Sequence, residues 1–238
     1  MKNSASIHLP QVWVSENQHA TLLLGDCPQL LQTMKTDTFD CVVTSPPYNL
    51  IRNWTGGGPE SCLKSFTKKL RTDWYPDSID ESSYQDEQRQ VVAELVRVCR
   101  GSVWYNHKVR YAWKRRNCIY HPLDWLRDCP IWCEIIWDRG GSKAGSSRRC
   151  HHADERIYQI GRPRVWHQGP WTTIWRIAQT PDSGHPCSFP VELPRRCIEL
   201  DPKYMREAIR RIELAIEAAK RTQLELPGTA ETDGDRGY

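Results

Sequence analysis

The 238-residue sequence predicts an α/β fold in one domain, and three observations support this class. Apolar runs of strand length occur at 39–44, 103–105 and 132–137. A segment with apolar residues at helical spacing lies between the first two runs. Strands that alternate with helices are typical of α/β domains, and a chain of this length can bury a sizeable core.

The first elements are a polar lead-in at 1–20 and a short apolar strand at 21–24, which a helix at 29–34 follows. Asp26 lies between the strand and the helix. A carboxylate at the carboxyl end of a strand faces the crevice that binds ligands in open α/β sheets. Asp26 can equally cap the helix, so the sequence leaves both interpretations open.

The next strand, 39–44, ends in a loop with few hydrogen-bond donors, Ser45-Pro46-Pro47-Tyr48. Each proline lacks a backbone N–H, fixes its own φ and holds the preceding residue in an extended conformation. The Ser45 hydroxyl and the Pro46 carbonyl can therefore point at one target without competing donors. A flat ring would stack on Tyr48.

This loop suits the exocyclic amine of a nucleobase. Cytosine N4 and adenine N6 are poor nucleophiles because their lone pair is delocalised into the ring. Two acceptors that take the amine hydrogens would draw the nitrogen toward tetrahedral geometry. The lone pair would then be exposed to an electrophilic methyl group, which is stabilisation directed at the transition state.

The middle of the chain continues the alternation. A long loop at 53–80 precedes a helix that Ser82 or Ser83 would cap and that ends just before Gly101. A strand then begins at 103 and another covers 132–137, with an amphipathic helix near 122–127 between them. The tryptophans expected in the core are Trp104, Trp132 and Trp137.

Basic and aromatic residues are interleaved from 104 to 175, which suits a surface that contacts phosphates and supports an extruded base. The glycine- and serine-rich loop at 140–149 is too polar to pack. Its cations Lys143, Arg148 and Arg149 are predicted to contact the DNA backbone.

The C-terminal part contains a helix at 191–198 and a final helix that Glu199 or Asp201 would cap. A polar, glycine-bearing tail at 226–238 is expected to be disordered. We therefore expect one domain at 21–225.

Composition excludes several classes of protein. The net charge of +4 is mild and does not by itself indicate a nucleic-acid binder. The ten cysteines show no C-x-x-C spacing and are interpreted as reduced thiols, and no set of residues matches a standard metal site. No segment has the apolar length of a membrane span or of a signal peptide, so we expect a cytoplasmic protein without a membrane partner.

Five motifs, in this order, resemble those of the amino-methylating DNA methyltransferases, the N4-cytosine and N6-adenine group, in the permuted arrangement. The resemblance covers about 22–212. The motifs are Leu23-Leu24-Gly25-Asp26, Thr44-Ser45-Pro46-Pro47-Tyr48-Asn49, Trp137-Asp138-Arg139-Gly140-Gly141-Ser142, His185-Pro186-Cys187-Ser188-Phe189-Pro190-Val191-Glu192-Leu193 and Glu199-Leu200-Asp201-Pro202-Lys203-Tyr204.

The resemblance implies a Rossmann-like methyltransferase fold with a mixed sheet, S-adenosylmethionine as cofactor and double-stranded DNA as substrate, as in restriction-modification systems. The loop residues Ser45, Pro46, Pro47 and Tyr48 would be catalytic, and Asn49 would help to hold the loop beside the DNA. The residues implied at the cofactor are Asp26, Phe189, Glu199 and Asp201. Serine at the first loop position favours cytosine N4 over adenine N6.

One family segment is missing from the sequence. The family carries a strand, a glycine-rich turn and a helix between the Phe189-Pro190 motif and the Glu199-Leu200-Asp201 motif, but here the two motifs are directly joined. The glycine turn lets the backbone approach the cofactor, and its strand would pair with 39–44. A second hypothesis is therefore a decayed member that binds DNA without methylating it. Its partner would be a second copy of this chain or an intact methyltransferase subunit.

Overall fold

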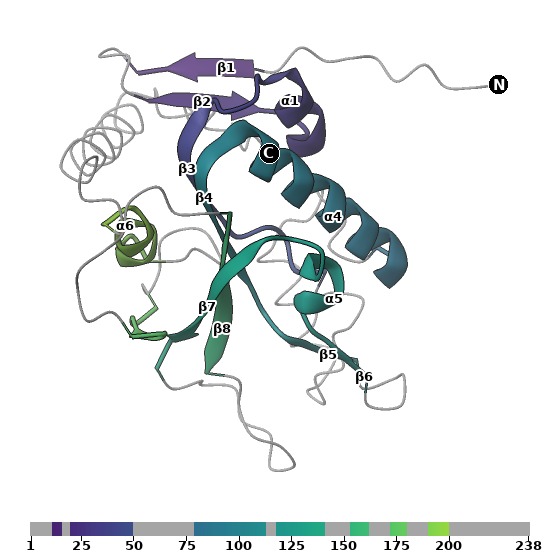
Figure 1. Ribbon diagram of the computed structural model, residues 1–238, viewed down its shortest axis with the longest axis vertical. Coiled ribbons are helices and arrows are strands. Elements are labelled where there is room, and N and C mark those ends of the chain that lie inside the picture. The colour runs from purple at the N-terminus through teal and green to yellow at the C-terminus, as the bar shows by residue number, and fades with distance from the viewer. Residues whose placement is uncertain are drawn as a thin grey trace, which may run out of the picture. The chain divides into compact units, whose positions relative to one another are not determined.

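The computed structural model describes residues 11–15, 20–49, 79–112, 118–140, 153–161, 172–179 and 190–199 (Figure 1). These residues fall into two compact units, one that ends at Gly25 and one that begins at Asp26. In the first unit, β1 (Gln11–Val14) and β2 (Thr21–Leu24) form an antiparallel hairpin. β2 confirms the strand predicted at 21–24, and β1 shows that part of the lead-in is also a strand.

The second unit is built on a five-stranded mixed sheet. Its strands, in spatial order, are β3 (Phe39–Thr44), β4 (Cys99–His107), β8 (Asp154–Ile160), β7 (Ile131–Asp138) and β9 (Ile174–Arg176). β3 is parallel to β4, and β9 is parallel to β7, whereas β8 is antiparallel to both of its neighbours. A short hairpin of β5 (Arg110–Ala112) and β6 (Cys118–Tyr120) follows β4 in the sequence.

In the described part of the chain, four helices accompany the sheet: α1 (Cys27–Thr33), α4 (Glu81–Val98), α5 (Leu123–Leu126) and α6 (Glu192–Glu199). α4 connects the parallel strands β3 and β4, which is the crossover that parallel strands require. The prediction of a Rossmann-like α/β fold with a mixed sheet is confirmed. Among the described residues, β3 is the first strand of the sheet and pairs with β4 alone. The family strand that the sequence lacks was expected beside β3.

Two local predictions about α4 are wrong. Asp80, not Ser82 or Ser83, caps the helix, because its carboxylate accepts a hydrogen bond from the Ser82 backbone N–H at 3.1 Å. The helix ends at Val98, and Gly101 lies inside β4. A Cβ at Gly101 would come within 2.1 Å of the Asp40 carbonyl oxygen, so the glycine permits close approach of β3.

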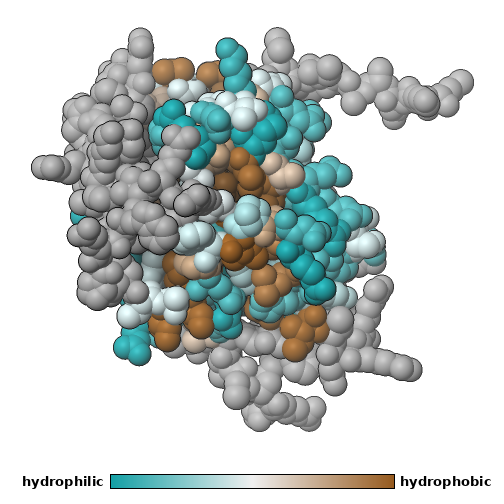
Figure 2. Space-filling model, in the orientation of Figure 1, coloured by the Kyte–Doolittle hydropathy of each residue, from teal (hydrophilic) through white to brown (hydrophobic). Residues whose placement is uncertain are grey.

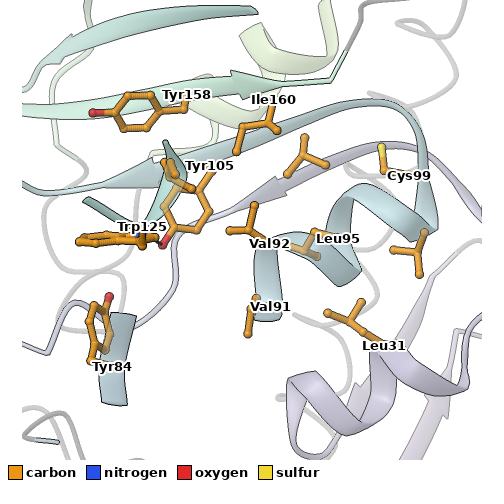
Figure 3. Close-up of a cluster of buried hydrophobic side chains, with 13 residues drawn as sticks. Leu31, Tyr84, Val91, Val92, Leu95, Cys99, Tyr105, Trp125, Tyr158 and Ile160 are labelled. Atoms are coloured by element: carbon orange, nitrogen blue, oxygen red, sulfur yellow. Dashed lines mark hydrogen bonds between the residues drawn. The ribbon is translucent and has the colours of Figure 1, made fainter. Parts of the chain in front are cut away.

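Two hydrophobic cores lie on opposite faces of the sheet, and β4 contributes alternate residues to each. Val103 and Tyr105 belong to the core beneath α4, whereas Trp104 belongs to the core that Leu193 of α6 covers. Figure 3 shows the first core, in which Tyr105 and Trp125 are joined by a hydrogen bond of 3.1 Å. The outward face of α4 is hydrophilic (Figure 2), as expected for a helix that covers a sheet.

Trp104 and Trp137 are buried as predicted, but Trp132 is 47% exposed, so its prediction is wrong. The difference coincides with an irregularity in the register of β7 and β8 between Ile131 and Cys133. Ile135 and Trp137 face the core beneath α6, whereas Trp132 lies at this irregularity and stays exposed. Within the described ranges, no helix is long and apolar enough to cross a membrane.

Candidate active site

Polar side chains from four strands meet at one edge of the five-stranded sheet. Ser45 follows the carboxyl end of β3, and Asn106 lies near the carboxyl end of β4. Glu155 lies at the amino end of β8, which runs antiparallel to β4 and therefore starts at the same edge. Arg139 comes directly after β7. Ligands of open α/β sheets bind at the carboxyl ends of the parallel strands, which is this edge.

The two side-chain oxygens of the predicted catalytic loop are in contact. Ser45 Oγ lies 2.6 Å from the Tyr48 hydroxyl oxygen. The Tyr48 hydroxyl donates to Glu155 Oε2 at 3.0 Å, and Asn106 Nδ2 donates to the Tyr48 oxygen at 2.7 Å. The structure thus brings Ser45 and Tyr48 together and ties both to β4 and β8.

Glu155 is the central acceptor of this group. Its Oε2 also accepts from Asn106 Nδ2 at 2.8 Å, and its Oε1 accepts from Arg139 Nη1 at 2.9 Å. Glu155 is 7% exposed and Asn106 is 1% exposed. A carboxylate is tolerated at such a buried position because it is paired and hydrogen-bonded. We call Ser45, Tyr48, Asn106, Arg139 and Glu155 the serine cluster.

The serine cluster keeps the Tyr48 phenol protonated. Burial raises the pKa of Tyr48 well above its usual value, and the nearby negative charge of Glu155 raises it further. The hydroxyl is therefore a hydrogen-bond donor at physiological pH rather than a phenolate.

The same loop is held from the other face of the sheet through the Pro47 carbonyl. The Tyr84 hydroxyl lies 2.8 Å from the Pro47 carbonyl oxygen and 2.6 Å from His107 Nε2, and these two atoms share its single hydrogen. His107 Nδ1 lies 2.8 Å from the Lys108 carbonyl oxygen. Because a carbonyl can only accept, Nδ1 carries a hydrogen, and Nε2 of the neutral ring is an acceptor.

Burial, followed by the charge of Arg110, lowers the pKa of His107 to about 3. The imidazole is therefore neutral at physiological pH. Arg110 is paired with Glu81 through two hydrogen bonds of 2.7 and 2.6 Å, and its guanidinium lies 4.7 Å from the centre of the Tyr84 ring. We call Glu81, Tyr84, His107 and Arg110 the proline support.

The ring of Tyr48 lies between these two groups. It packs on His107 with ring centres 4.5 Å apart and planes tilted by 42°. One face of the phenol ring is therefore used inside the protein. The residue as a whole is partly buried.

Asn49 completes the loop in the left-handed region, with φ of 53°, a conformation that asparagine adopts more readily than most residues. Its Nδ2 donates to the Ile79 carbonyl oxygen at 3.0 Å, and its side chain is fully buried. This position suits the expected role of holding the loop, but it leaves no side-chain surface for DNA.

Asp26 is the N-cap of α1, where its carboxylate accepts from the Gln29 backbone N–H at 3.1 Å. Of the two interpretations that the sequence left open, the structure displays the capping role. The other predicted residues are outside the described part of the chain or have side chains outside it. They are Phe189, Glu199 and Asp201 for the cofactor, and Lys143, Arg148 and Arg149 for DNA.

Sequence reasoning did not single out Asn106 or Glu155. Each is a buried polar residue near the end of a strand, and a buried polar residue marks a hydrogen-bond network or a site. The strand at 154–160 was not predicted, so the position of Glu155 opposite Trp137 could not be anticipated.

Comparisons with known proteins give distant likenesses. No protein-family model matches the chain, and no curated protein matches it. Among solved structures, the chain is similar to TTHA0409 of Thermus thermophilus, a protein provisionally assigned as a DNA modification methylase. The match has 18% identity and a TM-score of 0.46, and it covers 73% of this chain and 71% of that one.

Two further structures of TTHA0409 give similar values. The selenomethionine derivative matches with 16% identity and a TM-score of 0.45, and the complex with S-adenosylmethionine matches with 18% identity and a TM-score of 0.46. Both matches again cover 73% of this chain and 71% of the other. Similarity at this level does not establish the activity of the present chain.

Proposed function

We propose that this protein is a site-specific DNA methyltransferase that transfers a methyl group from S-adenosylmethionine to an exocyclic base amine. The target is N4 of cytosine or N6 of adenine in double-stranded DNA, and Ser45 favours cytosine N4. The observation that carries the proposal is the Ser45 hydroxyl, which the serine cluster holds at the ligand-binding edge of the sheet.

The loop acts on the amine. Ser45 Oγ and the Pro46 carbonyl oxygen each accept one amine hydrogen, which makes the lone pair of the nitrogen available. When bound, S-adenosylmethionine would supply the methyl group and would keep the electron pair of the broken S–C bond on its sulfur. The product nitrogen then releases one proton to water. The protein thus supplies two fixed acceptors where positive charge develops.

Tyr48 supports the base. A target amine inside a duplex is out of reach, so the base must rotate out of the stack. The phenol ring rests on the buried His107 with one face, and the flipped base would stack on its other face. Lys143, Arg148 and Arg149 would neutralise DNA phosphates beside this edge.

The described residues do not by themselves fit the cofactor. Of the four positions implied by the resemblance, only the Asp26 side chain is described, and its carboxylate is engaged as a helix cap. The glycine turn that would let the backbone approach the cofactor is missing from the sequence. This is the observation that favours the second candidate, a family member that binds DNA without methylating it.

One experiment separates the two candidates. The protein is incubated with radiolabelled S-adenosylmethionine and unmethylated plasmid DNA, and the digested nucleosides are analysed. N4-methylcytosine or N6-methyladenine is expected. Calorimetry with the cofactor alone accompanies the assay. Absence of a methylated nucleoside, together with no heat at millimolar cofactor, would leave DNA binding as the remaining function.

A further inference from the structure

The hydrogens of the serine cluster can be assigned because Glu155 can only accept. The Tyr48 hydroxyl has one hydrogen, and its nearest obligate acceptor is Glu155 Oε2 at 3.0 Å. Once this hydrogen is used, the Tyr48 oxygen is an acceptor toward Ser45. The Ser45 hydroxyl must then donate across the 2.6 Å contact.

Asn106 reinforces this arrangement. Its Nδ2 donates to the Tyr48 oxygen at 2.7 Å and to Glu155 Oε2 at 2.8 Å, and it lies 3.4 Å from Ser45 Oγ. Among the described residues, the Asn106 Oδ1 is buried without a hydrogen-bond partner. The amide therefore leaves its own oxygen unsatisfied while its nitrogen donates within the cluster. Leaving a buried acceptor unpaired costs free energy, which indicates that Asn106 is placed to donate from Nδ2 rather than to accept through Oδ1.

Arg139 keeps Glu155 in place as an acceptor. The guanidinium contacts Oε1 at 2.9 Å, which leaves Oε2 for Tyr48 and Asn106. Both side chains of the ion pair are largely buried, so bulk water does not replace either partner.

We propose that Glu155, anchored by Arg139, orients the Ser45 hydroxyl through Tyr48 so that oxygen lone pairs, not the hydrogen, face the target amine. This inference rests on the proposed function and identifies Glu155 as a positioning residue. Without the carboxylate, the Tyr48 hydrogen could turn to Ser45, and the Ser45 hydrogen would then turn outward. The Ser45 hydroxyl and the target amine would then both present hydrogens to each other, and the amine would lose Ser45 as an acceptor.

The test uses the full-length Glu155→Gln variant, which keeps the size of the side chain. Single-turnover methyl transfer to unmethylated plasmid DNA is expected to slow on the order of 10- to 100-fold, with the KM for DNA unchanged within about twofold. The ¹³C signal of the Tyr48 Cζ carbon, in protein with labelled tyrosine, is expected to shift because the phenol loses its charged acceptor.

Glu134→Gln is the matched control. Glu134 also accepts from a tyrosine hydroxyl, that of Tyr158, at 3.1 Å, but it does not contact the serine cluster. This variant should shift the Tyr158 signal and leave both the Tyr48 signal and the transfer rate unchanged. If Glu155→Gln does not fold, Tyr48→Phe replaces it, because that variant keeps the ring and removes the hydroxyl. The same loss of rate at constant KM is expected.

The outcomes are separable. A wild-type transfer rate in Glu155→Gln, or an unshifted Tyr48 signal, overturns the orienting role of Glu155. If the wild-type protein transfers no methyl group, the proposed function fails. The Tyr48 signal then decides the orientation alone, since it depends on the contact with Glu155 and not on activity.

Discussion

The serine cluster and the proline support hold one four-residue loop from opposite faces of the same sheet, and each contains a buried ion pair. In the serine cluster, the Arg139–Glu155 pair connects through Tyr48 to the Ser45 hydroxyl. In the proline support, the Arg110–Glu81 pair is enclosed by Tyr84 and Trp125, and the contact with the loop is to a backbone carbonyl.

The difference separates two tasks that similar residues can perform. The Arg139–Glu155 pair is hydrogen-bonded through Tyr48 to the Ser45 hydroxyl, so it can set the orientation of that hydroxyl. The Arg110–Glu81 pair is packed among aromatic rings, so it stabilises the backbone that carries Ser45. We therefore expect changes in the proline support to alter folding, and changes in the serine cluster to alter the rate of transfer.

The largest effect is expected for Arg110→Met. The substitution leaves Glu81 without its buried partner, and the free energy of unfolding should fall by about 3 to 5 kcal/mol. Urea denaturation measures this change. Arg89→Met is the control, because the Arg89–Asp86 pair is exposed and should contribute at most about 1 kcal/mol. Equal effects of the two substitutions would refute a structural role of the buried pair.

A smaller effect is expected from the titration of His107. Its pKa is about 3 in the folded protein and 6.5 in the unfolded chain. Between these values the unfolded chain binds a proton that the folded protein does not, so stability is complete above pH 6.5 and falls as the pH decreases. The slope from this group approaches about 1.4 kcal/mol per pH unit.

The measurement for His107 compares the wild type with His107→Gln, which does not titrate. Urea denaturation between about pH 7 and pH 5 should give a shallower loss of stability in the variant, whatever its stability at neutral pH. Parallel pH profiles would show that the imidazole is not held neutral in the folded protein.

The smallest effect is expected for Tyr84→Phe, which removes one hydroxyl and leaves the ring. The Pro47 carbonyl and His107 Nε2 lose the one hydrogen that they share, so the free energy of unfolding should fall by about 1 to 3 kcal/mol. Tyr158→Phe removes a hydroxyl whose acceptor, Glu134, is more exposed than His107. It should therefore lower the free energy of unfolding by less. A smaller loss in Tyr84→Phe than in Tyr158→Phe would contradict the proline support.

The catalytic loop could be predicted from sequence because its properties are local. Two prolines after a strand fix the backbone and remove donors, and this holds wherever the strand lies. The strands at 21–24, 39–44 and 132–137 and the helix at 191–198 were likewise evident from short patterns. At Asp26 the sequence permits two interpretations, because both a cap and a ligand-binding carboxylate occur between a strand and a helix.

The serine cluster could not be predicted, because it depends on the register between distant strands. Glu155 reaches Tyr48 only because β8 is inserted antiparallel between β4 and β7, with Glu155 opposite Trp137. The exposure of Trp132 has the same origin, since this residue lies at the irregularity in the register between β7 and β8. Asp80 was overlooked as a cap in favour of the nearby serines, although aspartate is an equally good cap.

The most direct test of the central claim is the methyl-transfer rate of Ser45→Ala beside its affinity for DNA. The account predicts a rate about 100-fold lower in single turnover, because one of the two acceptors for the amine is lost, and a Kd for DNA within about twofold of the wild type. Ser83→Ala, an exposed change on α4, should alter neither quantity. An unchanged rate in Ser45→Ala, or equal losses of rate and affinity, would contradict the account.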